Sequence, residues 1–288
     1  MSNSTPWAPS RRLLLAGAGA AALPWPAFAQ PAPTGPPPTP EQIAAQLPLK
    51  TTGLEHVSIQ VPDVQAAAEF YGRVFGPRLR KEKDPPLRYY VPLKVGYIAI
   101  GAARDRPVMI DHYCALVEDY NRAAMAERLK QEGLQAGRFG MFPDPDGSQL
   151  QLLGAPGGWA PTIIDAEPIS PDPPIVQPLA LENVIVQVAD VDRAIAWYRK
   201  FFPGKLTRPG PDRAWIQVAD TRLGLMKAAE GARPVISSFC VKVARYDHKA
   251  VPGRIEKLGG EIVRTSGEDR GVLRFRSPMG ITVDIKEA

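Results

Sequence analysis

The chain has 288 residues, of which 44% are hydrophobic and 23% are charged, and these values are ordinary for a soluble globular protein. Its net charge is +5, but no run of basic residues is interleaved with aromatic residues, so the composition argues against a nucleic-acid partner. The length is sufficient for about two domains.

Residues 1–29 are typical of an export signal. Arg11 and Arg12 precede an apolar run, Leu13–Leu23, and Ala27–Ala29 has the small-x-small pattern of a cleavage site. The paired arginines favour the twin-arginine route, with a general secretory signal as the alternative. The run is too short for a stable membrane span. We therefore expect a soluble mature protein that is periplasmic or secreted.

Two Pro-rich stretches divide the rest of the chain. Residues 30–50 contain PAPTGPPPTP and are expected to form an extended tether, and residues 155–178 contain SPDPP and are expected to form a linker. They leave two candidate domains, 51–154 and 179–288. Cys114 and Cys240 fall in different domains, so we expect two buried thiols rather than a disulfide, although an exported protein could form one.

The first candidate domain begins with a strand, a turn and a helix. Apolar and polar residues alternate over Leu54–Val61, which predicts a strand with one apolar face. Asp63 can cap the helix predicted over Val64–Phe75, whose apolar residues recur at helical spacing and can cover that face. His56 is left pointing away from the helix.

The remaining elements of this domain repeat the same order of strand, helix and further strands. An Asp-Pro-Asp-Gly turn joins the last two strands. This order predicts a sheet curled around a cavity, with helices outside. The expected elements are strands near Arg88–Leu93, Val95–Gly101 and Met109–Val117, a helix near Tyr120–Glu132, and strands near Gly137–Phe142 and Ser148–Leu153.

The two candidate domains repeat each other in sequence. LEHVSIQVPDVQAAAEFY at Leu54–Tyr71 aligns without a gap with LENVIVQVADVDRAIAWY at Leu181–Tyr198. FPDPDGSQLQLL at Phe142–Leu153 aligns with FRSPMGITVDIK at Phe275–Lys286. This tandem repeat indicates duplication of a whole domain.

Two of the three histidines are expected to face one cavity. His112 shares a strand face with Cys114, and Gln151 shares one with Gln149, while the residues between them take the faces where helices pack. His56 and His112 therefore point toward the same interior. They are candidate metal ligands, and the alternative is that they are hydrogen-bonded cavity residues.

Other polar residues have weaker claims to a role. Tyr97 and Cys114 also face the cavity and are candidates for proton transfer, with cavity lining as the alternative. Glu55 and Asp111 each precede a histidine directly, so strand alternation places them on the opposite face and we assign them no catalysis. His248 is expected at the surface.

The pairing of GLEHVSIQVPDVQAAAEFYGRVFG with the later FPDPDGSQLQLL resembles the vicinal oxygen chelate superfamily. That superfamily includes glyoxalase I, extradiol dioxygenases and the bleomycin and fosfomycin resistance proteins. The resemblance implies an α+β fold of two tandem domains, each built of paired βαβββ units that form a half-barrel around a divalent metal. It implies metal positions at His56, Ala99, His112 and Gln151, and Ala99 cannot bind a metal.

The resemblance also implies equivalent positions in the second domain, at Asn183, Gly224, Ser238 and Asp284. One carboxylate without an imidazole is a poor transition-metal site. We therefore expect the second domain to be without metal, and to serve structure or to shape the cleft of the first domain.

Two neutral imidazoles can hold Fe, Mn, Ni or Zn, and a third ligand from Gln151 would leave positions for two adjacent substrate oxygens. We therefore expect a metal-dependent enzyme of dioxygenase or lyase type, acting on a small catechol-like or enediol-like molecule. The amide of Gln151, where a carboxylate is usual, favours an alternative: a binding protein of the bleomycin-resistance type without turnover. A structural role is the third hypothesis.

Overall fold

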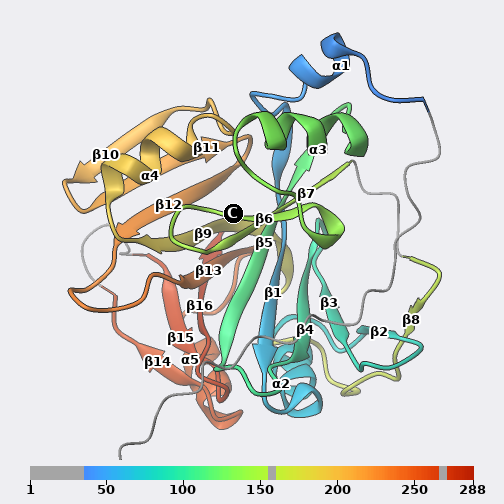
Figure 1. Cartoon of the computed structure of the whole chain (residues 1–288). Coiled ribbons are helices and arrows are strands. Elements are labelled where there is room, and N and C mark those ends of the chain that lie inside the picture. Colours follow the sequence, from blue (N-terminus) through green and yellow to red (C-terminus); the bar gives the residue numbers. More distant parts are fainter. Residues whose placement is uncertain (1–35, 155–159, 266–270) are drawn as a thin grey trace, which may run out of the picture. The chain divides into compact units, whose positions relative to one another are not determined.

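The computed structural model of the chain describes residues 36–154, 160–265 and 271–288 (Figure 1). The predicted export signal, residues 1–29, lies outside the described residues and stays a prediction. Within the described ranges, no helix combines the length and apolar character needed to cross a membrane.

A long first strand, β1 (Thr51–Val61), lies at the centre of the N-terminal half. β5 (Met109–Val117) pairs with it antiparallel on one side, and β4 (Tyr97–Ala102) pairs with it parallel on the other. Figure 1 shows β1 in blue between these two strands. The other elements of this half are α2 (Val64–Phe75), β2 (Arg80–Glu82), β3 (Tyr89–Pro92), α3 (Arg122–Gln131), the 3-10 helix η1 (Arg138–Gly140), β6 (Met141–Pro143) and β7 (Gln149–Gly154).

The C-terminal half begins with a strand of the same length, β9 (Pro178–Val188). β12 (Thr221–Lys227) pairs with it parallel, and β13 (Ile236–Val243) pairs with it antiparallel. The other elements of this half are α4 (Val191–Tyr198), β10 (Leu206–Gly210), β11 (Arg213–Val218), α5 (Ala250–Lys257), β14 (Glu261–Val263), β15 (Leu273–Arg276) and β16 (Thr282–Glu287).

The helix after β1 forms as its sequence predicts. The Oδ1 atom of Asp63 accepts a hydrogen bond from the backbone N–H of Ala66 at 2.9 Å, which caps α2. Tyr71 and Val74 of α2 and Val57 of β1 are fully buried in one hydrophobic core. The predicted bounds of this helix and of strand Met109–Val117 are confirmed. The mixed α+β class is also confirmed, and the sheet is not closed.

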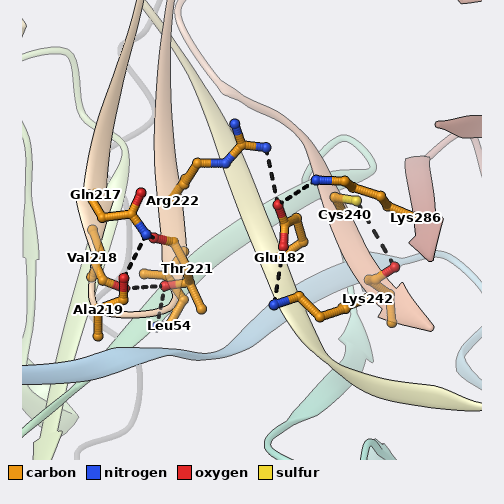
Figure 2. A network of polar contacts seen from close by, with 11 residues as sticks. Leu54, Glu182, Gln217, Val218, Ala219, Thr221, Arg222, Cys240, Lys242 and Lys286 are labelled. Carbon is orange, nitrogen blue, oxygen red and sulfur yellow. Dashed lines mark hydrogen bonds and ion pairs between the residues drawn. The ribbon is translucent and has the colours of Figure 1, made fainter. Parts of the chain in front are cut away.

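One sheet runs through both halves of the chain. Its order is β10-β11-β12-β9-β13-β5-β1-β4-β3-β2-β8, where β8 is Ile163–Asp165, and β16 and β7 extend from β13 and β5. The halves join where Ile236 of β13 pairs with Ile110 of β5. The backbone N–H of Leu54 also donates to the Oγ1 atom of Thr221 at 3.0 Å (Figure 2). The division into domains at 51–154 and 179–288 stays a prediction.

The described parts of the two Pro-rich segments contain short regular elements. Pro40–Ala44 forms α1, where Thr39 and Gln42 hydrogen-bond each other as a capping box and Pro40 occupies the first turn. Ile163–Asp165 forms β8, which pairs with β2. Proline is compatible with the first turn of a helix, so Pro content alone did not predict these elements.

Three register shifts interrupt the pairing of β1 with β5, and two of them lie beside His56 and His112. The register shifts between Leu54 and His56, which leaves Glu55 as an extra residue on β1, and a second shift leaves Asp111 as an extra residue on β5. A bulge breaks the alternation of side chains and re-aims the extra residue. Gly96 supports the first bulge: its φ is +82°, and a Cβ there would lie 1.9 Å from the carbonyl oxygen of Glu55.

Candidate metal centre

Four side chains form one row across β4, β1, β5 and β7. Tyr97, His56, Cys114 and Gln151 are successive Cα partners in the sheet. Paired residues project from the same face, and His112 shares that face because it lies two residues before Cys114. The structure therefore brings together all five residues that we predicted for the site.

The imidazoles of His56 and His112 meet edge to face. Their Nε2 atoms are 3.3 Å apart, and the side chains are buried, with 3% and 8% of each residue exposed. The Nδ1 atom of His56 lies 2.7 Å from Oε2 of Glu55, and that of His112 lies 2.9 Å from Oδ2 of Asp111. A carboxylate only accepts hydrogen bonds, so each neutral ring carries its hydrogen on Nδ1 and presents a lone pair on Nε2. The two lone pairs repel unless a cation or a shared proton lies between them.

The positions of Glu55 and Asp111 correct our expectation that they point away from the histidines. Simple strand alternation would place them on the opposite face, but each is the extra residue of a β-bulge. The bulges turn both carboxylates back toward the imidazoles. A carboxylate on the Nδ1–H of a histidine fixes the tautomer and ring orientation that a metal ligand needs. Sequence reasoning missed this role, although an acid directly before each histidine was a visible signal.

The separation of the two nitrogens fits a shared metal ion. Two metal–nitrogen bonds of about 2.0–2.1 Å that meet at a tetrahedral angle place the nitrogens about 3.3 Å apart. The Nε2 atoms of His56 and His112 have this separation. This distance therefore permits both nitrogens to bind one ion.

Gln151 is the third candidate donor and lies on the same face. Its Nε2 atom donates to the backbone carbonyl of Phe139 at 2.9 Å, and its Oε1 atom is buried without a hydrogen-bond partner among the described residues. A buried unsatisfied carbonyl oxygen costs free energy. Ligation to a cation would satisfy it. Phe139 has a left-handed φ of 60°. The sequence did not indicate that its backbone carbonyl would orient the Gln151 amide.

Burial and charge set the protonation of the site. Burial lowers the pKa of His56, the hydrogen bond that His56 donates to Glu55 opposes this shift, and a charge on His112 lowers the pKa further. His56 is therefore neutral near pH 7, which is the form that binds metals. Burial opposes ionisation of Asp111, but the hydrogen bond and charge of His112, together with Arg106, lower its pKa overall.

Tyr97 and Cys114 border the histidine pair. The ring of Tyr97 stacks on His56, with 4.4 Å between centroids and 12° between planes. Burial raises the pKa of the Tyr97 hydroxyl and of the Cys114 thiol, and the charge of Glu55 adds to both shifts. Both groups keep their protons at neutral pH, so they can donate protons but are poor bases. Ligand atoms of Glu55, His56 and Cys114 lie within 4.8 Å of one another.

The equivalent row of the C-terminal half has different chemistry. Its successive Cα partners are Arg222, Asn183, Cys240 and Asp284. Both carboxylate oxygens of Asp284 accept from Arg274, at 2.7 and 2.8 Å. A cation of the protein therefore already neutralises the carboxylate that could have bound a metal.

His248 lies apart from the paired histidines. Its side chain is 62% exposed and lies 3.2 Å from Glu287. The prediction that it is a surface residue is confirmed.

Comparison with known proteins identifies relatives of this fold. Residues 53–161 match the family model described as Glyoxalase/Bleomycin resistance protein/Dioxygenase superfamily. The comparison with curated protein sequences found no match.

Several solved structures share the fold over most of the chain. The 2,3-dioxygenase LapB from Pseudomonas sp. KL28 has a TM-score of 0.61 and 13% identity, covering 84% of this chain and 93% of LapB. The Mn(II)-bound glyoxalase from Novosphingobium aromaticivorans has a TM-score of 0.61 and 14% identity, covering 83% of each chain. Homoprotocatechuate 2,3-dioxygenase from Arthrobacter globiformis has a TM-score of 0.59 and 16% identity, covering 84% of this chain and 82% of that enzyme. At such identities the similarity shows the fold alone.

Proposed function

We propose, on the premise that residues 53–161 match the model of the glyoxalase/bleomycin resistance protein/dioxygenase superfamily, that the chain is a metal-dependent enzyme of dioxygenase or lyase type. Its substrate would be a small molecule with two adjacent oxygens, such as a catechol or an enediol. One observation carries the proposal: the Nε2 atoms of His56 and His112 face each other at 3.3 Å, each ring held by a carboxylate on its Nδ1.

His56, His112 and Gln151 would hold one divalent ion, of Fe, Mn, Ni or Zn, through two imidazole nitrogens and one amide oxygen. When bound, such an ion polarises two adjacent substrate oxygens as a Lewis acid. One protein of similar fold is a Mn(II)-bound glyoxalase, and others are dioxygenases, which supports this cofactor class.

The chain's own residues would orient and shield the reacting centre. Glu55 and Asp111 keep the imidazoles in one tautomer, and the stacked ring of Tyr97 limits rotation of His56. Tyr97 and Cys114 are the candidate proton donors, because burial keeps both protonated. The low exposure of both histidines keeps bulk water away, which strengthens electrostatic interactions with a bound substrate.

The paired arginines and cleavage pattern of residues 1–29 support export by the twin-arginine route. That route carries folded proteins, so the metal would be loaded before export, and the enzyme would act in the periplasm or outside the cell.

A second candidate function is sequestration of a small molecule without turnover. Gln151 favours it, because a neutral amide attracts a metal ion less than a carboxylate does. The raised pKa values of Tyr97 and Cys114 favour it too, because neither group can serve as a base at neutral pH.

The metal content of anaerobically purified protein tests the site. We expect a stoichiometric divalent metal in the wild type and its loss in His56→Ala and His112→Ala. His248→Ala is the matched control, because this exposed histidine lies outside the pair, and it should keep the metal. Metal retained by His112→Ala at the wild-type level would contradict the proposed centre.

A turnover assay distinguishes the two candidate functions, catalysis and sequestration. Protein reconstituted with Fe(II) or Mn(II) should consume O₂ in the presence of a catechol, or should isomerise an aldehyde adduct through an enediol. His112→Ala should catalyse neither reaction. Binding of these molecules without turnover by metal-loaded protein would favour sequestration.

A further inference from the structure

A cavity of about 530 Å³ lies in the C-terminal half. Its lining includes Asn183, Ile185, Trp215, Arg222 and Lys286, from β9, β11, β12 and β16. No residue of the histidine site lines it. Its volume falls within the range of about 300–1,000 Å³ that small-molecule sites occupy.

The wall formed by Arg222 and Lys286 carries an excess of positive charge. Both side chains donate to the same Oε1 atom of Glu182 at 3.1 Å, and Lys242 lies 3.3 Å from its Oε2 atom. Figure 2 shows the three cations directed at this one carboxylate. Three positive charges on one negative charge leave two in excess beside the cavity, which attracts an anion.

The carboxylates that line the cavity do not balance this excess. Asp284 accepts from Arg274 through both oxygens, at 2.7 and 2.8 Å. Glu287 lies 3.2 Å from His248 and accepts from the backbone N–H of Tyr246 at 2.9 Å. Arg274 therefore neutralises Asp284, whereas Glu287 offsets one of the two excess charges, because His248 is charged only when protonated. One positive charge remains in excess, so Arg222 and Lys286 determine the sign of the potential.

Another part of the lining is apolar, with one polar feature that points to a ligand. Trp215 and Ile185 provide apolar surface, and the guanidinium of Arg222 lies 4.5 Å from the centroid of the indole ring. Asn183 is 6% exposed, and its Oδ1 atom has no hydrogen-bond partner among the described residues. A buried acceptor of this kind is costly unless a donor reaches it. A ligand that carries a hydroxyl group could supply the donor.

We propose that this cavity binds a small organic carboxylate with a ring-sized apolar body and a hydroxyl group. Arg222 and Lys286 bind the carboxylate, Trp215 and Ile185 contact the apolar body, and Asn183 accepts from the hydroxyl. This function adds to the one proposed for the N-terminal site and does not depend on a metal there. It also gives the C-terminal half a ligand of its own.

The test is calorimetric titration of the full chain with 4-hydroxybenzoate, which has all three features. We expect binding to the wild type and at least about tenfold weaker binding of 4-hydroxybenzyl alcohol, which keeps the ring and the hydroxyl but lacks the charge. Benzoate, which lacks the hydroxyl, should also bind more weakly. Equal affinity for the acid and the alcohol would overturn the proposal, and this comparison needs no variant.

Variants locate the site. Arg222→Gln should weaken binding of 4-hydroxybenzoate at least about tenfold. Arg213→Gln is the matched control, because Arg213 also lies over Trp215, at 5.0 Å, without lining the cavity, and it should bind as the wild type does. The double variant His56→Ala/His112→Ala should bind as the wild type does, whatever its metal content. Loss of binding in that double variant, or unchanged binding in a folded Arg222→Gln protein, would overturn the assignment.

Discussion

The two halves of the chain place different chemistry on the same row of a similarly paired sheet. In the N-terminal half the row holds His56 and Gln151, and it contains no lysine or arginine. In the C-terminal half the row holds Arg222 and Asp284, and Arg274 binds the carboxylate. One arrangement leaves electron pairs for an added cation, whereas the other contains its own cations.

The bulge residues show the same contrast. Glu55 and Glu182 are both the extra residue beside the row, one residue before His56 and Asn183. Glu55 accepts from one imidazole, whereas Glu182 contacts Arg222, Lys242 and Lys286. The backbone thus provides a carboxylate in both halves, and the residues around it decide whether it orients a metal ligand or organises positive charge.

The largest expected effect is loss of stability on removing Arg274. Arg274→Met would leave the buried carboxylate of Asp284 without its cation, which costs about 3 kcal/mol in free energy of unfolding. Arg276→Met is the matched control on the same strand, because its ion pair with Glu261 is exposed and is worth less than about 1 kcal/mol. Urea denaturation measures both. The contrast fails if the two variants lose equal stability.

A smaller effect is expected on metal affinity from the carboxylate behind His56. Glu55→Gln keeps the size of the side chain but lets the amide present a donor to Nδ1, so the imidazole loses its fixed tautomer. Loss of such an outer partner lowers metal affinity roughly 10–100-fold. Competition with a chelator measures the change. Glu182→Gln, at the equivalent bulge position, should leave metal affinity unaltered, and equal losses in the two variants would refute the assignment.

The smallest effect is expected on the pH dependence of stability. Burial opposes ionisation of Glu182, but the hydrogen bond and charge of Lys286, with Lys242 and Arg222, lower its pKa below the usual 4.5. A lowered folded pKa stabilises the protein above pH 4.5 and loses that contribution as pH falls through the folded pKa.

Glu182→Gln removes this contribution. Because the three cations are partly exposed, we expect a loss of about 1 kcal/mol at pH 7 that shrinks below pH 4.5. Urea denaturation of wild type and variant across this range measures the difference. A difference that stays constant with pH would show that the charge of Glu182 contributes nothing.

Much of the N-terminal half could be predicted from local patterns. Alternation and helical spacing located β1, α2 and β5, and they put His56 and His112 on one interior face. The roles of Glu55 and Asp111 could not be predicted, because a bulge depends on how two strands align rather than on one strand's own residues. The charge cluster of the C-terminal half could not be predicted either, because Arg222, Lys242 and Lys286 come from three different strands.

The contact between Gly96 and the carbonyl oxygen of Glu55 makes the proposed chemistry sensitive to a residue that takes no part in it. Even a methyl group at position 96 would collide with that oxygen and displace the bulge. The acid behind His56 would move with the backbone. Harmful substitutions in this protein would therefore extend to Gly96, which has no functional group of its own, and a survey of tolerated variants should show this position to be as restricted as the histidines.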